Sequence, residues 1–161
     1  MKKILLLFVL FLTGSVFAQV PNIRLKTLGG RDVQFQDFVK NDGKPVIVNF
    51  FATWCKPCLQ ELKAISEVYD EWQEETGVRM IIVSIDDART TARVRPLVNA
   101  QGWDFDVLLD VNSDLRRAMN VQNPPHTFIL NGDGEIVSQH VGYSPGSENK
   151  LIEEVRRLVA E

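Results

Sequence analysis

Residues 49–58 read Asn-Phe-Phe-Ala-Thr-Trp-Cys-Lys-Pro-Cys, and this stretch contains the only two cysteines of the chain, Cys55 and Cys58. The apolar run at 46–51 that leads into it predicts a buried strand, and the residues from Pro57 onward predict a helix. Two thiols at this spacing, where a strand passes into a helix, can form and break one disulfide reversibly. The stretch therefore predicts redox chemistry at the two cysteines.

The N-terminus has the composition of an export signal. Two lysines precede an apolar run at 4–12, and the small residues Val16 and Ala18 suit cleavage before Gln19. The run is shorter than the roughly 18 to 20 residues that span a bilayer, which argues against a membrane anchor. We therefore predict a signal peptide at 1–18 and an exported protein of the periplasm or bacterial envelope, with no stable membrane insertion after cleavage. In that oxidising compartment, thiols stay reduced only with a dedicated electron supply.

Residues 19–161 are enough for one domain and too few for two. The chain has 18 basic and 21 acidic residues, and loss of the two signal lysines leaves a formal charge of −5. Mild acidity without a basic patch argues against nucleic acid and anionic lipid as partners. We expect one soluble, monomeric domain.

Signals for strands and helices alternate along the rest of the chain. In chain order, we expect a hairpin of strands 23–25 and 33–35 around Gly29 and Gly30, a strand at 46–51, a helix at 57–76 ended by Gly77, a strand at 78–85, a helix at 94–101, a strand at 105–109, a short helix capped by Ser113, a hairpin of strands 126–130 and 135–141, and a C-terminal helix from 147. Leu151, Ile152, Val155, Leu158 and Val159 give this last helix one apolar face. This order indicates an α/β sandwich.

From about residue 21 onward, the sequence resembles the thioredoxin superfamily and, within it, the exported TlpA/ResA-like thiol–disulfide oxidoreductases. The resemblance rests on residues 48–58, on Glu61, on Val-Ser-Ile-Asp at 83–86 and on Pro-His-Thr-Phe-Ile-Leu at 125–130. It implies a three-layer α/β/α sandwich with a central mixed β-sheet and an N-terminal β-hairpin extension. It also implies an enzyme without a cofactor that takes electrons from a membrane thiol carrier and reduces protein disulfides, among them those of apocytochrome c.

The two cysteines are predicted to have different roles. Cys55 lies at the start of the predicted helix, where unpaired N–H groups and the helix dipole stabilise a thiolate, so it is the expected nucleophile. Cys58, one turn further on, is the expected resolving thiol, which releases the product and leaves a Cys55–Cys58 disulfide. The alternative is a structural disulfide. A four-residue loop would contribute only about 2 kcal/mol, so this alternative is the weaker one.

Glu61 falls on the same helical stripe as Cys58, Ile65, Val68 and Trp72. An acid on an apolar face has a raised pKa if it is buried, and it can then exchange a proton with a thiol one turn away. The alternative is that Glu61 flanks the stripe and reaches solvent. The resemblance favours the proton acceptor and donor. Thioredoxin has a buried aspartate where this chain has Asn49, so the acid has moved from the strand to the helix.

Four residues are expected at the substrate-binding surface: Trp54, Pro124, Pro125 and His126. The resemblance implies that Pro125 follows a cis bond and borders the disulfide, although the proline doublet leaves open which bond is cis. Trp54 is expected to cover the thiols, with core packing as the alternative. For His126, an exposed histidine without a function is preferred over one that adds a pH-dependent charge.

Lys56 and Pro57, between the two cysteines, are expected to tune the reduction potential, with a merely solvated Lys56 as the alternative. The family usually has Trp in place of Phe51 and Thr in place of His126, and these differences are expected at the rim of the site. His140, Trp103, Asp86 and Asp87 are interpreted as structural or solvated.

Three classes of function fit these residues. The first is the exported disulfide reductase, and the second is a net oxidase or isomerase that uses the same residues in the opposite direction. The third is a copper(I) carrier that uses Cys55 and Cys58 as a dithiolate. Two cysteines and two scattered histidines make no tetrahedral zinc set, so no metal cofactor is expected.

Overall fold

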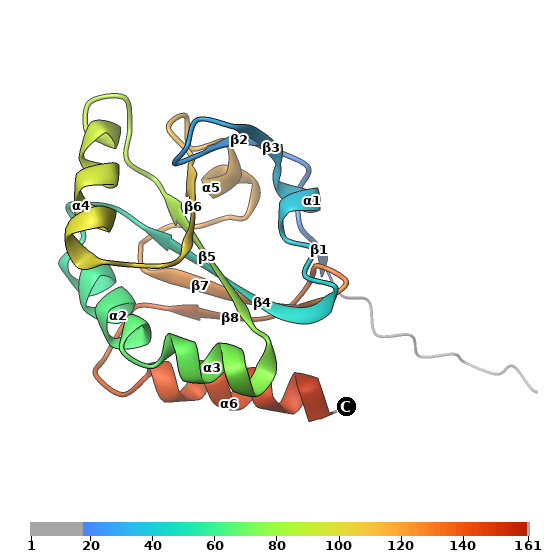
Figure 1. Cartoon of the computed structure of the whole chain (residues 1–161). Coiled ribbons are helices and arrows are strands. Elements are labelled where there is room, and N and C mark those ends of the chain that lie inside the picture. Colours follow the sequence, from blue (N-terminus) through green and yellow to red (C-terminus); the bar gives the residue numbers. More distant parts are fainter. Residues whose placement is uncertain (1–17, 161) are drawn as a thin grey trace, which may run out of the picture.

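The computed structural model describes residues 18–160, so the predicted signal peptide lies outside the described residues except for Ala18. These residues form one eight-stranded mixed sheet in the order β1-β8-β7-β4-β5-β6-β2-β3 (Figure 1). The strands are β1 Ala18–Gln19, β2 Arg24–Thr27, β3 Asp32–Gln34, β4 Gly43–Phe51, β5 Arg79–Ser84, β6 Asp106–Leu109, β7 His126–Gly132 and β8 Glu135–Val141. The helices are α1 Phe35–Phe38, α2 Lys56–Ser66, α3 Tyr69–Thr76, α4 Val94–Gln101, α5 Asp114–Ala118 and α6 Glu148–Ala160, with a 3₁₀ turn at Thr91–Arg93.

Helices lie on both faces of the sheet, as the predicted α/β/α sandwich requires. Helices α2, α3, α4 and α6 cover one face, and the short helices α1 and α5 lie on the other (Figure 1). The side chain of Phe51 reaches the first face, where its ring packs edge-on against Trp103 at a centroid distance of 6.3 Å. The second face is covered by less helix than the first.

Strand β4 is the centre of the sheet. It pairs in parallel with β5 and antiparallel with β7, and its residues 45–51 are all buried. A strand that is covered on both faces carries a continuous apolar run, which is the pattern that predicted it. The N-terminal hairpin is also confirmed: β2 pairs antiparallel with β3 and extends the sheet by pairing with β6. At the opposite edge, β1 pairs with β8.

The single helix predicted at 57–76 is wrong, because the structure has two helices, α2 and α3, with a break at Glu67 and Val68. The Ser66 hydroxyl donates to the Lys63 carbonyl at 2.7 Å, and the Val68 N–H bonds to Ile65, three residues back. A side chain that competes for helix carbonyls in this way favours a bend or an end. The predicted end at Gly77 is confirmed, with φ of 68°.

Two smaller predictions also need correction. Ser113 precedes α5, but its side chain makes no capping hydrogen bond. The buried Asp110 carboxylate accepts instead from the N–H groups of Leu115 and Arg116, at 3.2 and 2.7 Å. On α6 the predicted apolar face is buried except near its end, where Val159 is 46% exposed.

Candidate active site

The two cysteines lie where β4 passes into α2. Cys55 is the N-cap of α2, Pro57 lies in the first turn, and the Cys55 sulfur accepts a hydrogen bond from the Cys58 N–H at 3.4 Å. The cysteines form a disulfide with a Cα–Cα distance of 5.3 Å. Cys58 is fully buried and Cys55 is 6% exposed, so the cysteine at the helix N-terminus is the more accessible residue of the two.

Asp86 holds the turn that leads into the disulfide. Its carboxylate accepts from the N–H of Thr53 at 2.9 Å and from the hydroxyl of Thr53 at 2.6 Å. A third bond comes from the hydroxyl of Ser84, at 2.8 Å. Because Asp86 is fully buried, this network ties the turn before Cys55 to the end of β5. Its structural interpretation is confirmed.

The Pro124–Pro125 bond is cis, which settles the question that the proline doublet left open. His126 follows directly and pairs with Phe50 in the antiparallel β4–β7 ladder. The start of β7 therefore lies at the same end of the sheet as Phe51, the last residue of β4, which precedes Cys55 by four residues. The Pro125 carbonyl accepts from the N–H of Gly142 at 2.8 Å, which fixes the proline against the end of β8.

Glu61 is buried, with 3% of its surface exposed, so the predicted stripe on α2 is confirmed. The Asn49 side-chain amide donates to its carboxylate at 2.7 Å and to the Thr127 hydroxyl at 2.7 Å. The Thr127 hydroxyl and the second carboxylate oxygen are 3.4 Å apart. One polar cluster thus joins β4, β7 and α2 on the side of the helix that also carries Cys58.

Burial raises the pKa of Glu61 from 4.5 to about 7, because desolvation outweighs the hydrogen bonds from Asn49 and Thr127, which favour the charged form. The nearby Glu148 carboxylate adds a smaller upward effect. Glu61 also lines a pocket of about 370 Å³ between the end of β8 and the start of α6, with Tyr143 and Lys150 among the other lining residues. A carboxyl with a pKa near neutrality can both accept and donate a proton.

The other predicted site residues have different environments. Lys56 and Pro57 are exposed between the cysteines, and Trp54 is 58% exposed, so core packing of this tryptophan is wrong. The preferred interpretation of His126 as an exposed side chain is also wrong, because only 6% of it is exposed. Its ring stacks on Phe128 at a centroid distance of 4.5 Å, and its Nε2 lies 3.0 Å from Oε1 of Gln139.

The remaining candidates are structural or solvated, as interpreted. Trp103 is buried in the core, and Asp87 forms an exposed ion pair with Arg89. His140 lies 3.2 Å from Glu154 of α6. Phe51, one of the differences expected at the rim, is fully buried in the core, so that expectation is wrong.

Within residues 18–160, no group of three or more His, Cys, Asp or Glu side chains is placed to hold a metal ion. Among the helices in the same part of the chain, none has the length and hydropathy to cross a membrane.

Thr127 is a residue of the site that the sequence interpretation missed. The signal was present but indirect: pairing of the two predicted strands so that 126 faces 50 puts Thr127 opposite Asn49. The contact between Asn49 and Glu61 was also missed, because it depends on how α2 lies over the sheet.

Several known proteins are similar to this chain in sequence. Residues 16–139 match the model of the AhpC/TSA family. The thiol–disulfide oxidoreductase ResA of Bacillus anthracis is 32% identical over 124 residues, which cover 77% of this chain and 68% of that protein. The thioredoxin-like protein YneN of Bacillus subtilis is 36% identical over 128 residues, covering 77% and 70% of the two chains.

Among solved structures, this chain is similar to an uncharacterized thioredoxin-like protein from Porphyromonas gingivalis. The two share 52% sequence identity, and the TM-score is 0.79 over 91% of this chain and 95% of the other. At this identity the likeness extends from the fold to much of the sequence.

Proposed function

This chain belongs to the AhpC/TSA family and is a thiol–disulfide oxidoreductase of the ResA type, and from that premise we propose that it is an exported reductase of protein disulfides. The observation that carries the proposal is the buried Glu61 carboxyl, whose pKa is about 7 and which lies on the side of α2 that carries Cys58. An acid in this position can activate the second thiol at neutral pH.

The reaction starts from the reduced dithiol. The Cys55 thiolate attacks one sulfur of the substrate disulfide, forms a mixed disulfide and expels the other substrate sulfur as a thiolate. Glu61 takes the proton of the Cys58 thiol. The Cys58 thiolate then attacks the Cys55 sulfur, the second substrate sulfur leaves as a thiolate, and the Cys55–Cys58 disulfide forms. Two electrons have passed to the substrate.

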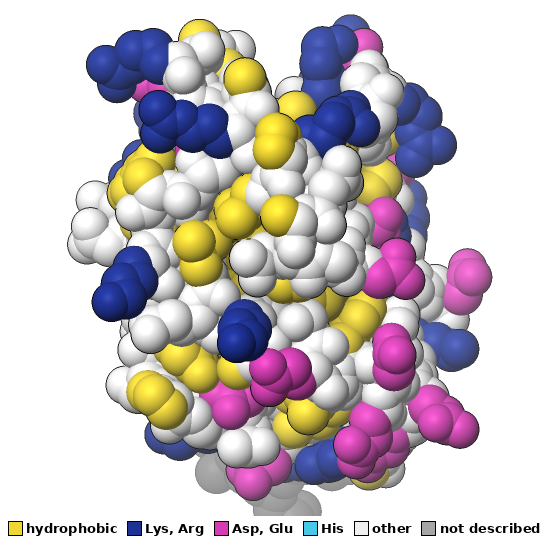
Figure 2. All heavy atoms as spheres, turned by 60° about the vertical axis from the view of Figure 1, so that its left-hand side comes forward, with side chains coloured by type: hydrophobic (Ala, Val, Ile, Leu, Met, Phe, Trp, Pro, Cys, Tyr) yellow, Lys and Arg dark blue, Asp and Glu magenta, His cyan; other side chains and the backbone are white. Residues whose placement is uncertain are grey.

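The surface around the disulfide supports a polypeptide substrate. Three large hydrophobic side chains are exposed among the described residues, and two of them, Trp54 and Val141, lie at the end of the sheet that carries the cysteines. Figure 2 turns the left-hand side of Figure 1 toward the reader. Hydrophobic side chains lie across the middle of this face, most Lys and Arg side chains lie toward its top, and most Asp and Glu side chains lie toward its lower right. Apolar surface of this kind binds protein chains.

The cellular setting follows from the signal predicted at 1–18. Cleavage there would release residues 19–161 as a monomeric thioredoxin-like domain outside the cytoplasm, with a membrane thiol carrier as the electron donor. The disulfide of apocytochrome c is the proposed physiological substrate. Trp54, Pro124, Pro125 and His126 would contact it, and Lys56 and Pro57 would set the reduction potential.

The reduction potential of the Cys55–Cys58 pair tests the direction of the reaction. A reductase is expected near the value of thioredoxin, about −270 mV, and a value near −120 mV would instead favour the oxidase alternative. A second test measures how fast the mixed disulfide is resolved. Glu61→Gln should slow resolution by about a hundredfold. Glu67→Gln, an exposed glutamate at the end of the same helix, should not.

A further inference from the structure

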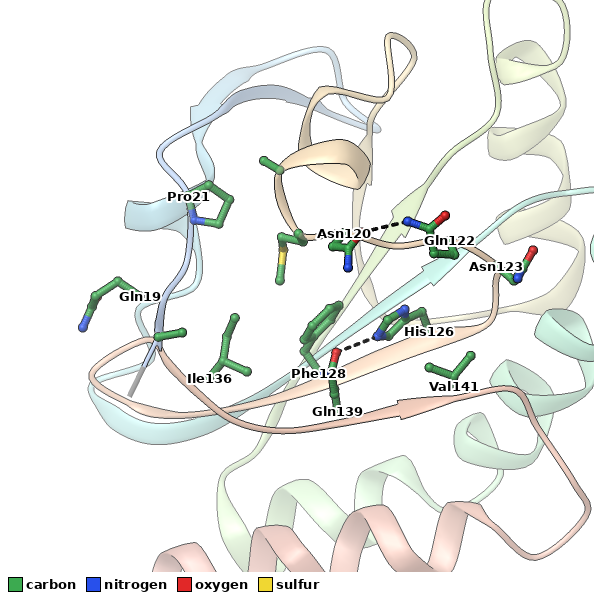
Figure 3. Close-up of a pocket in the computed structure, with 13 residues that line it drawn as sticks. Gln19, Pro21, Asn120, Gln122, Asn123, His126, Phe128, Ile136, Gln139 and Val141 are labelled. Carbon is green, nitrogen blue, oxygen red and sulfur yellow. Dashed lines mark hydrogen bonds between the residues drawn. The ribbon is translucent and has the colours of Figure 1, made fainter. Parts of the chain in front are cut away.

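A groove of about 690 Å³ lies on the sheet face that carries α5, beside the cis-proline loop (Figure 3). Its floor is the outer surface of β7 and β8, where Phe128, Ile136 and Val141 present apolar side chains. The residues that follow α5 form one wall, and Gln19 and Pro21, which remain after the proposed cleavage, form the other. The thin layer of α1 and α5 therefore leaves this part of the sheet open.

The side chains on the rim of this groove are polar but uncharged, and the proposed cleavage adds one α-amino group at Gln19, at the far end of the groove. The rim carries the carboxamides of Gln19, Asn120, Gln122 and Asn123, while Gln139 and His126 are polar residues of the floor. Of the residues described by the structure, none that lines the groove is Lys, Arg, Asp or Glu. Carboxamides offer both donors and acceptors, which is the pairing chemistry of peptide groups. Such a rim above an apolar floor suits an uncharged polypeptide better than an ionic ligand.

The groove runs away from the catalytic end of the sheet. Asn123 and Val141 lie at one end of it in Figure 3, and Gln19 and Ile136 at the other. The near end is continuous with the substrate-binding loop proposed above, because Asn123 precedes Pro124 and Val141 pairs with His126. Five steps along β8 separate Val141 from Ile136, or about 17 Å, which is the length of about five extended residues.

The outer edge of β8 is open along most of the same length. Strand β1 pairs only with Glu135 and Ile136, so residues 137–141 have no partner on that side among the described strands. An extended chain beside the groove would therefore meet unpaired N–H and C=O groups as well as the carboxamides of the rim.

We propose that this groove binds the substrate polypeptide beyond its disulfide, as an extended, uncharged segment of about five residues with apolar side chains, entering beside Pro125. The inference rests on the proposed reductase function and adds a substrate class to it. The preferred substrates are unfolded chains in which a cysteine is followed or preceded by such a segment.

The test compares disulfide-linked peptides that differ only beside the cysteine. One series carries zero to seven residues of alternating apolar and small uncharged side chains on the carboxyl side, and a second carries them on the amino side. In one of the two series kcat/KM should rise about tenfold with length and level off near five residues. Acidic residues in the same positions should abolish the gain. A rate that depends on neither length nor charge in both series overturns the proposal.

Matched variants connect the effect to the groove. Gln122→Glu places a charge at the rim, and Gln73→Glu makes the same change on the exposed surface of α3. The ratio of kcat/KM between the longest apolar peptide and the shortest should fall about tenfold in the first variant and stay constant in the second. An unchanged ratio in Gln122→Glu overturns the proposal.

Three measurements separate a groove that binds no peptide from an inactive reductase and from a dimer interface. The shortest peptide reports on the reductase function itself, because it does not reach into the groove; if wild type reduces no peptide, the proposed function fails rather than the groove. Binding of a long apolar peptide with Ser in place of Cys, followed by NMR, should shift the amide signals of Gln139 and Ile136. Sedimentation that shows a dimer broken by Gln122→Glu would mean that a second copy fills the groove, and this would overturn the proposal.

Discussion

The Asn49 side-chain amide on β4 donates a 2.7 Å hydrogen bond to the Glu61 carboxylate on α2, and both residues are buried. The bond links the strand that precedes the disulfide to the helix that follows it. It also opposes desolvation, because a donor to the charged form lowers the pKa of a carboxyl while burial raises it. The balance leaves the pKa of Glu61 near 7, in the range where it can serve a thiol.

Removal of the Asn49 donor should therefore move the pH dependence of catalysis. In Asn49→Leu the carboxylate loses a hydrogen bond to a charged group, which is worth roughly 1.5 to 3 kcal/mol, or about one to two pH units. The pH at which resolution of the mixed disulfide reaches half its maximal rate should rise by about that amount. Single-turnover rates between pH 5 and 9 measure it. Asn99→Leu, on the exposed surface of α4, is the control and should keep the wild-type profile.

Folding stability should also depend on the protonation of Glu61. Its pKa is raised from 4.5 to about 7 in the folded protein, so the folded state holds this proton more tightly than the unfolded chain does. The resulting stabilisation is fully present below pH 4.5 and is lost as the pH rises through 7. The loss amounts to about 3 kcal/mol in the free energy of unfolding.

Guanidinium unfolding of the oxidised protein at pH 4.5, 6 and 8 tests this linkage. Other groups titrate as well, so the informative quantity is the difference between wild type and Glu61→Gln. That difference should grow in favour of the variant as the pH rises. If both proteins lose stability in parallel, the Glu61 carboxyl is not the linked group.

Asp86 should matter for both stability and the rate of attack. Its carboxylate accepts three hydrogen bonds, and Asp86→Asn would turn an amide group toward one of the donors from Thr53 or Ser84. We expect a loss of roughly 1.5 to 3 kcal/mol in the free energy of unfolding. Attack by Cys55 should slow as well, because the turn before it is less fixed. Asp87→Asn breaks only an exposed ion pair and should change stability by less than about 0.5 kcal/mol.

Local sequence signals predicted the elements that carry the chemistry. The apolar run of β4 and the proline and cysteines after it located the strand-to-helix junction. Helical spacing put Glu61 on the stripe of Cys58 and Ile65, and the family resemblance favoured its burial over a position that reaches solvent. The same periodicity failed at the break between α2 and α3. The apolar spacing continues across residues 67 and 68, whereas the hydrogen bond from the Ser66 hydroxyl to the Lys63 carbonyl, which favours a bend, leaves no trace in that spacing.

Contacts between distant segments were harder to predict. His126 is buried because β7 lies between β4 and β8 and because its ring stacks on Phe128. Neither arrangement can be predicted from the residues next to His126 in the sequence. The cluster of Asn49, Glu61 and Thr127 joins residues up to 78 positions apart. Such sites need the strand register and the helix position, which a single sequence does not contain.

The two thiols should react in a fixed order, with Cys55 first. Cys55 is the more exposed cysteine and lies at the helix N-terminus, whereas Cys58 is fully buried. Cys58→Ser should therefore still attack a substrate disulfide but should be unable to resolve the product, so that the mixed disulfide accumulates. Cys55→Ser should accumulate little of it, because its remaining thiol is buried.

Mass spectrometry after incubation with a disulfide-containing protein, followed by acid quenching, compares the two variants. Peptide mapping of the Cys58→Ser adduct should place the bond at Cys55. Limited alkylation of the reduced wild type near neutral pH gives an independent readout, in which Cys55 should be modified first. If Cys55→Ser traps more substrate than Cys58→Ser, or if Cys58 is alkylated first, the roles are reversed and Glu61 would then lie beside the attacking thiol instead of the resolving one.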